Sequence, residues 1–580
     1  MKKIMGISAS QGISIGRVFY YLDEYLRVPE YTVKENEVNV EIARFEIAIE
    51  KTREELVELK NSLNKENSIN EAGFLDAHIL MLDDPELSKQ IKTKIIDSRY
   101  NAERALFETV KGFVELIKAS SDQYIKERTF DIRDVAKRVL GNLLYKKRVD
   151  LRDLNEEVIL IAHELLPSDT LTMDKRMVKG IATDAGGRTS HTAILARAFE
   201  IPAVLGLRNI TAEVRNGDMV IIDGGKGIVI VRPDEPTLEQ YRKKLNDWQK
   251  KEVELLNLNV LPAETKDGKK ILLKANIEIP EETESVISHG ADGVGLYRSE
   301  FFFIQPGEFA SEDEQYKAYS QVLSSMGDKP VTIRTIDLGG DKILPGTAYF
   351  EETNPILGWR SIRFCMTRKD IFETQLRALL RASVHGNLRI MFPMISGVEE
   401  LDQVLEFYEL VKLELEKEGV QFDKNIPLGI MIEVPSAALT ADILARKVKF
   451  FSIGTNDLIQ YTIAVDRGNE KIAYLYEPFH PGVLRLLKMI IEGAHSQSIP
   501  VAMCGEMAGD PYAAVILLGL GLDIFSMSSF SVPEIKNIIR SVSMVEAEEL
   551  VGTIFEMKSY KEIDRFVRGW MDERFEHLRQ

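Results

Sequence analysis

The sequence has few of the features that hold secreted and membrane proteins together. Its 580 residues include only two cysteines, Cys365 and Cys504, which are too few for a disulfide framework. No apolar run is long enough to span a bilayer, and residues 1–16 lack the sustained apolar stretch of a secretory signal. We therefore expect a cytoplasmic protein with no membrane insertion.

The sequence also lacks an excess of positive charge. Its formal net charge is −17 at pH 7. This argues against a nucleic-acid partner, because proteins that bind a phosphate backbone neutralise it with basic residues. The same charge favours a basic partner among proteins.

Two nucleotide or metal motifs are present only in part. Gly-Lys occurs at residues 225–226 and 268–269 without the Ser or Thr that follows in a P-loop, so no ATP site is expected. His163-Glu164 would need a second histidine at position 167 to form a zinc-binding HExxH motif, and that position is proline. We expect no zinc site there.

The stretch GGRTSHTAILAR, residues 186–197, places a histidine at the predicted start of a helix. Two glycines predict a tight turn, Thr189 and Ser190 are good N-cap residues, and TAILARA reads as a helix. His191 therefore falls in the first turn, where backbone N–H groups and the helix dipole favour an anion and disfavour an imidazolium. A neutral imidazole is nucleophilic, so we predict that His191 attacks phosphorus and becomes a phosphohistidine.

The character of the sequence changes several times along the chain, which at this length predicts roughly two to four domains. Strand-like residues at 4–21 give way to amphipathic helices with almost no glycine, and strand-like runs return from residue 157. The helices are therefore expected to be inserted into one α/β domain. The expected divisions are an α/β domain of residues 1–34 and 146–232, a helical insert at 35–145, a connecting helix at 233–261 and a second half at 262–580.

The helical insert has two interpretations. It is either a self-contained bundle or a docking groove for a partner. Asp83, Asp84 and Glu86 would face a basic partner in the second case, and a solvated run of charges explains these three residues equally well.

The second half predicts a (β/α)8 barrel. About eight short apolar runs alternate with helical stretches, and they begin at residues 271, 292, 331, 389, 429, 450, 501 and 523. The carboxyl ends of barrel strands meet on the face that carries the active site. Charged or polar residues end several of the runs: Arg298, Arg334, Glu433, Asn456, Asp457, Cys504 and Glu506.

These strand-end residues predict the chemistry of a ligand. Arg298 and Arg334 supply planar, charged donors for phosphate, and Arg467 adds a third cation after the sixth run. Glu433 and Asp457 are hard oxygen ligands that suit Mg²⁺ or Mn²⁺ and not zinc. Phosphoenolpyruvate fits this set, and the residues alone would also allow another phosphorylated acid.

Several segments resemble those of the phosphoenolpyruvate-utilising enzymes. TDAGGRTSHTAILARAFEIPAVLG is similar to the phosphohistidine segment of that family. The segments similar to its barrel motifs, in the same order and spacing, are LYRSEF, IRTIDLGGDK, NPILGWRSIR, MIEVPSA, FFSIGTNDL, DRGN and MCGEMAGD. Together they resemble the Enzyme I branch, the phosphoenolpyruvate–protein phosphotransferases of bacterial sugar transport, over nearly the whole chain.

The resemblance implies an activity and a set of partners. It implies that the phosphoryl group of phosphoenolpyruvate passes to His191 and then to a histidine of the phosphocarrier protein HPr, with release of pyruvate. HPr would bind the helical insert, and the chain would form a homodimer through the barrel. Thr170 would hydrogen-bond His191.

The resemblance also implies roles on the barrel. Glu433 and Asp457 would bind Mg²⁺, or Mn²⁺, and Cys504 would protonate the enolate of pyruvate. Arg360 and Lys342 match the motifs without a defined role. The residues implied to bind phosphoenolpyruvate are Arg298, Arg334, Asn456, Asp457 and Arg467.

Two other functions remain to be weighed. A dikinase-like transferase for small molecules would need a nucleotide domain, for which the chain has no room. A phosphorylatable scaffold with an inactive barrel would not need the complete set of rim residues. The remaining cysteine, Cys365, is interpreted as buried filler. The other histidines are interpreted as structural residues: His78, His163, His289, His385, His480, His495 and His577.

Overall fold

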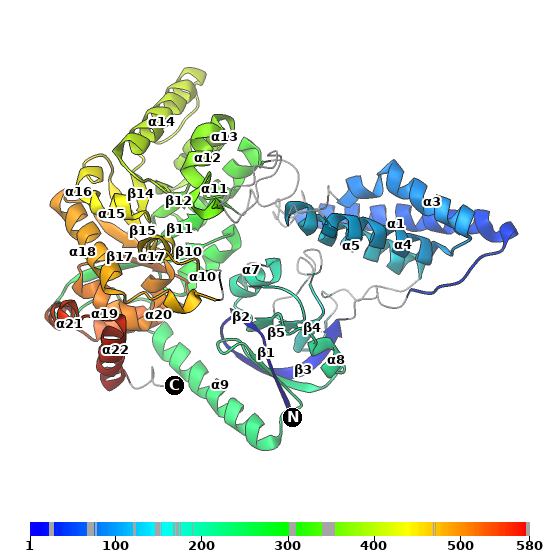
Figure 1. Ribbon diagram of the computed structural model, residues 1–580, viewed down its shortest axis with the longest axis horizontal. Helices are drawn as coiled ribbons and strands as arrows, with labels where there is room; N and C mark the ends of the chain where they lie inside the picture. Colours follow the sequence, from blue (N-terminus) through cyan, green and yellow to red (C-terminus); the bar gives the residue numbers. More distant parts are fainter. Residues whose placement is uncertain are drawn as a thin grey trace. The chain divides into compact units, whose positions relative to one another are not determined.

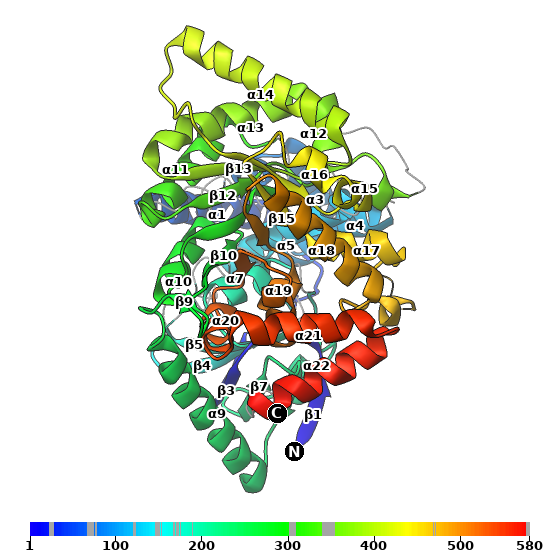
Figure 2. The same ribbon diagram turned by 90° about the vertical axis from the view of Figure 1, so that its left-hand side faces the viewer.

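The structure is a computed structural model. It forms two compact units, Met1–Gln249 and Lys250–Gln580, each described here by itself (Figures 1 and 2). Thr170, Lys342 and His577 lie outside the described residues. The described residues are 1–21, 28–65, 75, 78–119, 123–144, 151, 154–165, 169, 173, 176–187, 190–300, 309–338, 354–467, 469 and 471–575.

The first unit is built on a mixed sheet, which has eight strands among the described residues in the order β1-β8-β7-β3-β4-β5-β6-β2. Its central strands β3, β4, β5 and β6 run parallel. Their bounds, with those of the others, are β1 Lys2–Met5, β2 Ile7–Ser10, β3 Ile13–Tyr21, β4 Val158–Ala162, β5 Val178–Thr183, β6 Ala203–Leu205, β7 Met219–Asp223 and β8 Ile228–Val231.

Two short helices cover opposite faces of this sheet. Side chains alternate between faces along a strand, so Leu160 of β4 packs with α7 (His191–Ala198), whereas Ile159 packs with Ile210 of α8 (Ile210–Glu213). All five residues of β4 are buried for this reason, which explains its uninterrupted apolar sequence VILIA.

The helical insert leaves the sheet and returns to it at neighbouring strands. Val18 of β3 pairs with Ile159 of β4, and the helices lie between these strands in sequence. Arg44 ties the bundle together: it bonds Glu41 at 2.7 Å, Glu103 at 2.8 Å and the carbonyl of Leu143 at 3.2 Å. The elements are η2 Glu35–Glu37, α1 Val38–Lys65, α3 Pro85–Ser98, α4 Ala102–Ala119 and α5 Gln123–Leu143.

Helix α9 (Glu235–Leu256) follows the last strand of the first unit. Leu238 and Tyr241, in its first turns, pack against Ile221 and Ile230 of the sheet, and the Tyr241 hydroxyl donates to Asp223 at 3.2 Å. The predicted helix is confirmed, and its beginning belongs to the core of the first unit.

The second unit is a closed barrel of parallel strands, as the eight apolar runs predicted. Each strand from β10 to β17 pairs with the next, and β10 pairs with both β11 and β17, so the sheet closes. A short strand, β9 (Ala263–Glu264), joins β10 antiparallel. The barrel strands are β10 Lys270–Ile277, β11 Val294–Arg298, β12 Val331–Arg334, β13 Leu388–Phe392, β14 Leu428–Ile432, β15 Phe450–Ile453, β16 Val501–Met503 and β17 Ile524–Met527.

Helices surround the barrel (Figure 1). They are α10 Thr283–Ser288, α11 Glu312–Met326, α12 Ser361–Thr367, α13 Lys369–Ala382, α14 Val398–Glu418, α15 Pro435–Leu439, α16 Ala441–Leu444, α17 Thr455–Ile463, α18 Pro481–Ser496, α19 Pro511–Gly519, α20 Ser531–Arg540, α21 Met544–Glu556 and α22 Tyr560–Arg574. Short 3₁₀ turns are η4 Pro280–Glu282, η6 Pro355–Leu357, η7 Ser383–His385, η8 Ala473–Leu475 and η9 Glu506–Gly509. None of the helices in the described ranges combines the length and apolar character needed to cross a bilayer.

The barrel interior is filled with side chains and is not a pore. Leu296, Met391, Met431 and Phe450 form a buried cluster there with Cys504. This packing sits beneath the strand ends and supports the residues that the strands present at the rim.

Candidate active site

Two arginines lie side by side at the carboxyl ends of neighbouring strands. Arg298 ends β11 and Arg334 ends β12, and the two residues are partners in the strand register. Arg298 also bonds Glu278, and Arg334 is only 7 % exposed. Barrel closure thus places two guanidinium-bearing residues at one edge, as the sequence predicted.

A chain of alternating charges runs from Arg334 across the rim. Its guanidinium donates to Glu300 at 2.7 Å and lies 3.0 Å from one carboxylate oxygen of Asp337. The other oxygen of Asp337 accepts from Arg360 at 2.9 Å, and Arg360 also reaches Asp457 at 3.3 Å. Four of these five residues are less than 9 % exposed, so their charges are screened little by water.

The charge chain keeps both arginines ionised. Burial by itself would lower the pKa of Arg334, but the Glu300 and Asp337 carboxylates outweigh it and raise the pKa overall. Burial opposes ionisation of Arg360 in the same way, and Asp337 and Asp457 raise its pKa. Breaking any link would leave a buried charge without its partner, which is costly.

Glu433 lies beside this chain, directly after β14. It is 1 % exposed, and its Oε1 accepts from the backbone N–H of Met394 at 2.7 Å. A Cβ on Gly454 would lie 2.8 Å from Glu433 Oε2, so a larger residue there would displace the carboxylate. Burial, then repulsion from Asp337 and Asp457, raises the pKa of Glu433 to about 8.

The carboxylates fit a divalent cation. A cation would relieve the repulsion around Glu433, and Mg²⁺ commonly takes one or two protein carboxylates and completes its shell with water and substrate oxygens. Within the described ranges no three side chains of His, Cys, Asp or Glu gather as a complete protein cage. Glu433 and Asp457 are the two residues that the sequence predicted for this role.

Cys504 follows β16 and points into the barrel interior. It is 3 % exposed, and its backbone is held by Asn276, which donates to the Cys504 carbonyl at 2.9 Å. Burial raises the pKa of its thiol, so Cys504 keeps its proton at neutral pH and is suited to donate it. Cys365 is fully buried in α12, which agrees with its interpretation as filler.

Asn456 and Arg467 lie toward one side of the same rim. The Asn456 amide donates to the Glu506 carboxylate at 3.4 Å, and the Asn456 amide oxygen accepts from the backbone N–H of Glu506 at 3.2 Å. The Tyr476 hydroxyl donates to the carbonyl of Asn456 at 3.3 Å. Burial raises the pKa of Tyr476, and Arg467 is close enough to oppose this rise in part. The Arg467 residue itself is exposed.

Two members of the charge chain, Glu300 and Asp337, were missed by the sequence reasoning. Both stand in the segments LYRSEF and IRTIDLGGDK, so a signal existed: Glu300 follows the Arg298 strand end by two residues, and Asp337 follows Arg334 by three. Arg360, which had no defined role, joins Asp337 to Asp457.

Some polar atoms around this site are buried without a hydrogen-bond partner among the described residues. They are Arg334 Nε, Arg360 Nε and Thr455 Oγ1. Buried polar atoms usually have a partner. A polar ligand that completes the site would give these three atoms partners.

The start of α7 is made by consecutive residues. Gly186 has φ +104°, which favours glycine, and the N–H of Ser190 donates to the carbonyl of Gly187 at 3.1 Å. Ser190 is the N-cap, because its hydroxyl accepts from Ala193 N–H at 3.3 Å. His191 is the first residue of α7 and so lies in its first turn, as predicted; its side chain lies outside what the structure describes.

The three acidic residues of the insert have local partners. Asp83 pairs with Arg53, Asp84 caps α3 by accepting from the N–H of Glu86 at 2.8 Å, and the Glu86 carboxylate accepts from Gln90 at 3.0 Å. These contacts explain the residues structurally and leave the docking interpretation as a prediction.

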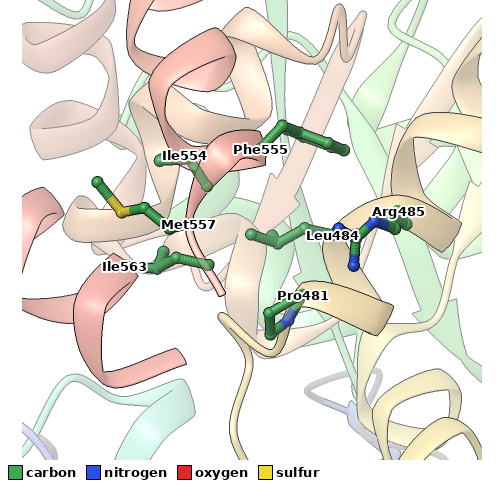
Figure 3. A pocket seen from close by; sticks show the side chains of 7 residues that line it. All are labelled: Pro481, Leu484, Arg485, Ile554, Phe555, Met557 and Ile563. Carbon is green, nitrogen blue, oxygen red and sulfur yellow. The ribbon is translucent and has the colours of Figure 1, made fainter. Parts of the chain in front are cut away.

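A pocket on the outside of the barrel contains none of the predicted site residues. It is lined from α18 by Pro481, Leu484 and Arg485, and the α21–α22 segment closes its other side with Ile554, Phe555, Met557 and Ile563 (Figure 3). The predicted chemistry is at the strand ends and not in this pocket.

Comparison with known proteins decides the family. Models of three parts of phosphoenolpyruvate-utilising enzymes match the chain: the PEP-binding domain at residues 252–544, the N-terminal part at 5–128 and the mobile domain at 154–227. The chain belongs to the phosphoenolpyruvate-utilising enzymes. The resemblance found in its motifs is therefore confirmed.

Relatives within this family match along their whole length. The chain is 46 % identical to a phosphoenolpyruvate-protein phosphotransferase of Priestia megaterium, with 98 % of this chain and 99 % of the relative covered. Proteins of the same name from Bacillus subtilis (strain 168) and Staphylococcus aureus are 45 % and 43 % identical, with 98 % of this chain covered in each case and 99 % and 100 % of the relative. A solution structure of Enzyme I (nEIt) is 45 % identical and covers 42 % of this chain and 99 % of its own, with a TM-score of 0.36.

Proposed function

We propose that this enzyme transfers the phosphoryl group of phosphoenolpyruvate to its own His191 and then to a histidine of the phosphocarrier protein HPr, releasing pyruvate. The observation that carries the proposal is the buried chain of alternating charges at the barrel rim. A small, highly charged ligand needs such preset partners, and an inactive scaffold would have no reason to bury them. The relatives named phosphoenolpyruvate-protein phosphotransferase support the same activity.

The arginines are proposed to bind the substrate and stabilise its transferring group. Phosphoryl transfer is mostly positioning and charge stabilisation, because the charge spreads over the equatorial oxygens. Arg298, Arg334 and Arg467 supply always-charged donors, and Asn456 orients the ligand through its amide together with Asp457. The buried carboxylates of Glu300 and Asp337 hold Arg334 in place, which reduces reorganisation during the reaction.

Glu433 and Asp457 are proposed to hold Mg²⁺, or Mn²⁺. The cation would supply charge neutralisation for phosphate and carboxylate oxygens of the substrate. The chain itself contributes the rigid placement of both carboxylates, with Glu433 fixed by the backbone of Met394.

Cys504 is proposed to protonate the enolate that remains when the phosphoryl group leaves. Its buried thiol keeps its proton until a strong base forms beside it, and the enolate carbon is such a base. The proton moves from Sγ to that carbon, and pyruvate is the product.

The work is proposed to be divided along the chain as the sequence predicted. Residues 1–34 and 146–232 would form the phosphohistidine domain, 35–145 the HPr-binding insert, 233–261 the connecting helix, and 262–580 the substrate-binding and homodimerising barrel. In-line attack needs reacting atoms within about 3–3.5 Å, so His191 cannot serve phosphoenolpyruvate and HPr from one fixed position. A substrate-gated swivel of the first domain would serve both. We place the enzyme in the cytoplasm, where Cys504 stays reduced.

The direct test offers labelled phosphoenolpyruvate and Mg²⁺ to the whole chain and to a fragment of residues 1–255. The whole chain should acquire acid-labile phosphate. The fragment should exchange phosphate with phosphorylated HPr and accept none from phosphoenolpyruvate, because every rim residue is missing. Uptake from phosphoenolpyruvate by the fragment would refute the barrel site, and failure of a folded fragment to exchange with HPr would refute the docking role of the insert.

The metal assignment has a separate test. Glu433→Gln keeps the shape of the side chain but removes its charge, so phosphoenolpyruvate-dependent labelling should fall sharply and require more Mg²⁺. A variant whose Mg²⁺ requirement and rate match the wild type would show that Glu433 does not hold the metal.

A further inference from the structure

A histidine and an aspartate stand opposite each other where two strands of the first unit end. Ala162 of β4 pairs with Thr183 of β5, and His163 and Asp184 are the next residues of the two chains. His163 Nδ1 lies 3.2 Å from Asp184 Oδ2. The Asp184 residue is 6 % exposed, whereas the His163 side chain is 53 % exposed.

The aspartate is held rigidly from its other side. Thr211, at the start of α8, donates its hydroxyl to Asp184 Oδ2 and its backbone N–H to Oδ1 at 3.3 Å. Thr211 thus fixes both oxygens of the Asp184 carboxylate, and Oδ2 also faces His163. The His163–Asp184 pair therefore has a fixed geometry on the side of the aspartate, unlike a pair of exposed side chains.

The pairing selects one tautomer of His163. An ionised carboxylate can only accept hydrogen bonds, so Nδ1 carries the proton and Nε2 keeps its lone pair. The exposed part of the ring thus presents Nε2 as a nucleophile, and the buried Asp184 carboxylate on the other side of the ring can balance a positive charge on the imidazole. This is the arrangement in which a carboxylate orients a reactive imidazole.

The pair lies against the turn that leads into α7. The N–H of Ala185, next to Asp184, donates to the carbonyl of His163 at 2.9 Å. The hydroxyl of Thr192, next to His191, donates to the carbonyl of Leu165 at 3.4 Å. The segment after β4 thus runs beside both ends of the turn that carries the predicted phosphohistidine.

We propose that His163 is a second phosphoryl-accepting histidine of this chain, taking the group from an N-phosphorylated imidazole. The proposal rests on the proposed function only for the source of that donor, which is phosphorylated His191 or the phosphorylated carrier. Nε2 of His163 attacks phosphorus and forms a P–N bond while the P–N bond of the donor breaks, and its electron pair returns to the donor nitrogen. His163 keeps its Nδ1 proton and becomes a phosphorylated imidazolium opposite Asp184. The donor leaves as a neutral imidazole, because its second nitrogen already carries a proton.

The barrel unit contains a matched control. His495 is also paired with an aspartate and also partly exposed, at 42 % of its side chain. Its Nε2 lies 2.8 Å from Asp523 Oδ2, so the nitrogen left free is Nδ1 and not Nε2. If any exposed histidine beside a carboxylate were reactive enough, His495 would be phosphorylated as readily as His163.

The test uses the full chain with His191→Ala and phosphoramidate as a small donor with a P–N bond. Sites are mapped by tandem mass spectrometry under alkaline conditions that preserve phosphohistidine. We expect acid-labile phosphate on Nε2 of His163, none when His163→Gln is added, and a rate at least about tenfold lower when Asp184→Asn is added, since removing the carboxylate that orients a functional imidazole costs that much. His495 should remain unmodified.

Two further arms identify the natural donor. The wild type with phosphoenolpyruvate and Mg²⁺ shows whether label reaches His163 after His191, and the His191→Ala chain with phosphorylated HPr tests direct transfer from the carrier. Absence of phosphate from His163 in the phosphoramidate arm, or equal labelling of His495, would overturn the proposal. If phosphoenolpyruvate fails to label the wild type at His191, the proposed function falls while the phosphoramidate arm still decides the role of His163.

Discussion

The barrel rim and the start of α7 are built in opposite ways. The charge chain of the rim brings together residues from 300 to 457, and nearly all of its members are buried and paired before any ligand arrives. The start of α7 is made by residues 186 to 193, through one glycine turn and one serine cap. A site that holds a small, highly charged molecule needs its partners preset, whereas a histidine that must meet two different partners is better placed on a short surface turn.

A second contrast lies within the barrel. The buried Arg334 is surrounded by carboxylates, which raise its pKa. Lys274, in β10, is 2 % exposed, and burial, with repulsion from Arg389, lowers its pKa to about 8. Burial is common to both side chains, and Asp292 raises the pKa of Lys274 less than burial lowers it, whereas the carboxylates around Arg334 outweigh burial.

The largest effect should come from the histidine itself. His191→Ala should fold normally and take up no phosphate from phosphoenolpyruvate, because the acceptor nitrogen is gone. The measurement is acid-labile label on the protein, with His495→Ala as a control that keeps full uptake. Normal labelling of His191→Ala would show that the start of α7 does not carry the phosphorylated residue.

Cys504→Ala should lower the rate of pyruvate formation by about 10²–10⁴-fold, the usual contribution of a positioned proton donor. The dissociation constant of phosphoenolpyruvate should change little, since the missing proton matters in the reaction and not in the ground state. Cys365→Ala is the matched control, because it also removes a buried thiol, from α12, and should leave the rate of pyruvate formation unchanged. A loss confined to binding would point to packing at Cys504.

Asp337→Asn tests whether the preset charge chain matters. The substitution leaves Arg334 and Arg360 buried with a partner missing, which costs about 3 kcal/mol or more of folding stability. Because Arg334 is then no longer held in place for the substrate, kcat/KM should fall as well, by about hundredfold or more. The exposed pair of Arg368 and Asp370, at 2.8 Å, provides the control. Asp370→Asn should cost about 1 kcal/mol of stability or less and leave kcat/KM unchanged. If Asp337→Asn and Asp370→Asn changed stability and kcat/KM equally, burial would not strengthen the ion pairs of the rim.

Lys274→Met sharpens the contrast between a buried cation with several close carboxylates and one without. The folded-state pKa of about 8 is below the ordinary 10.5, so the unfolded chain binds more protons between these values and stability should rise with pH there. Below pH 8 the protonated amine destabilises the barrel by roughly 3 kcal/mol, which Lys274→Met should recover at pH 7. Urea unfolding at pH 7 and pH 9.5 measures this; a wild-type stability that does not rise over this interval would contradict it.

Ser190→Ala should have the smallest effect. Loss of the N-cap of α7 should destabilise the first unit by about 1 kcal/mol. Ser543 caps α21 in the same way, accepting from Glu546 N–H at 3.2 Å, so Ser543→Ala should destabilise the barrel unit instead. Unfolding followed separately in the two units should therefore show each loss of stability in the unit that carries the substitution. If Ser190→Ala lowered the stability of the barrel unit, the start of α7 would not be stabilised by local contacts alone.

The sequence by itself determined the elements and their order. The eight barrel strands, the helices of the insert and the start of α7 at His191 all follow from periodicity, glycine and capping residues, which act over a few neighbouring positions. It also placed Arg298, Arg334, Glu433, Asp457 and Cys504 at strand ends, because strand ends can be read from where apolar runs stop.

Only the tertiary structure decided how these residues are paired. Asp337 bridges Arg334 and Arg360, and His163 meets Asp184 across 21 positions, because strand register and barrel closure bring them together. The pKa of Glu433 and that of Lys274 are likewise set by what surrounds them once water is excluded. Pairing and burial depend on contacts between distant parts of the chain, and no local pattern of residues encodes them.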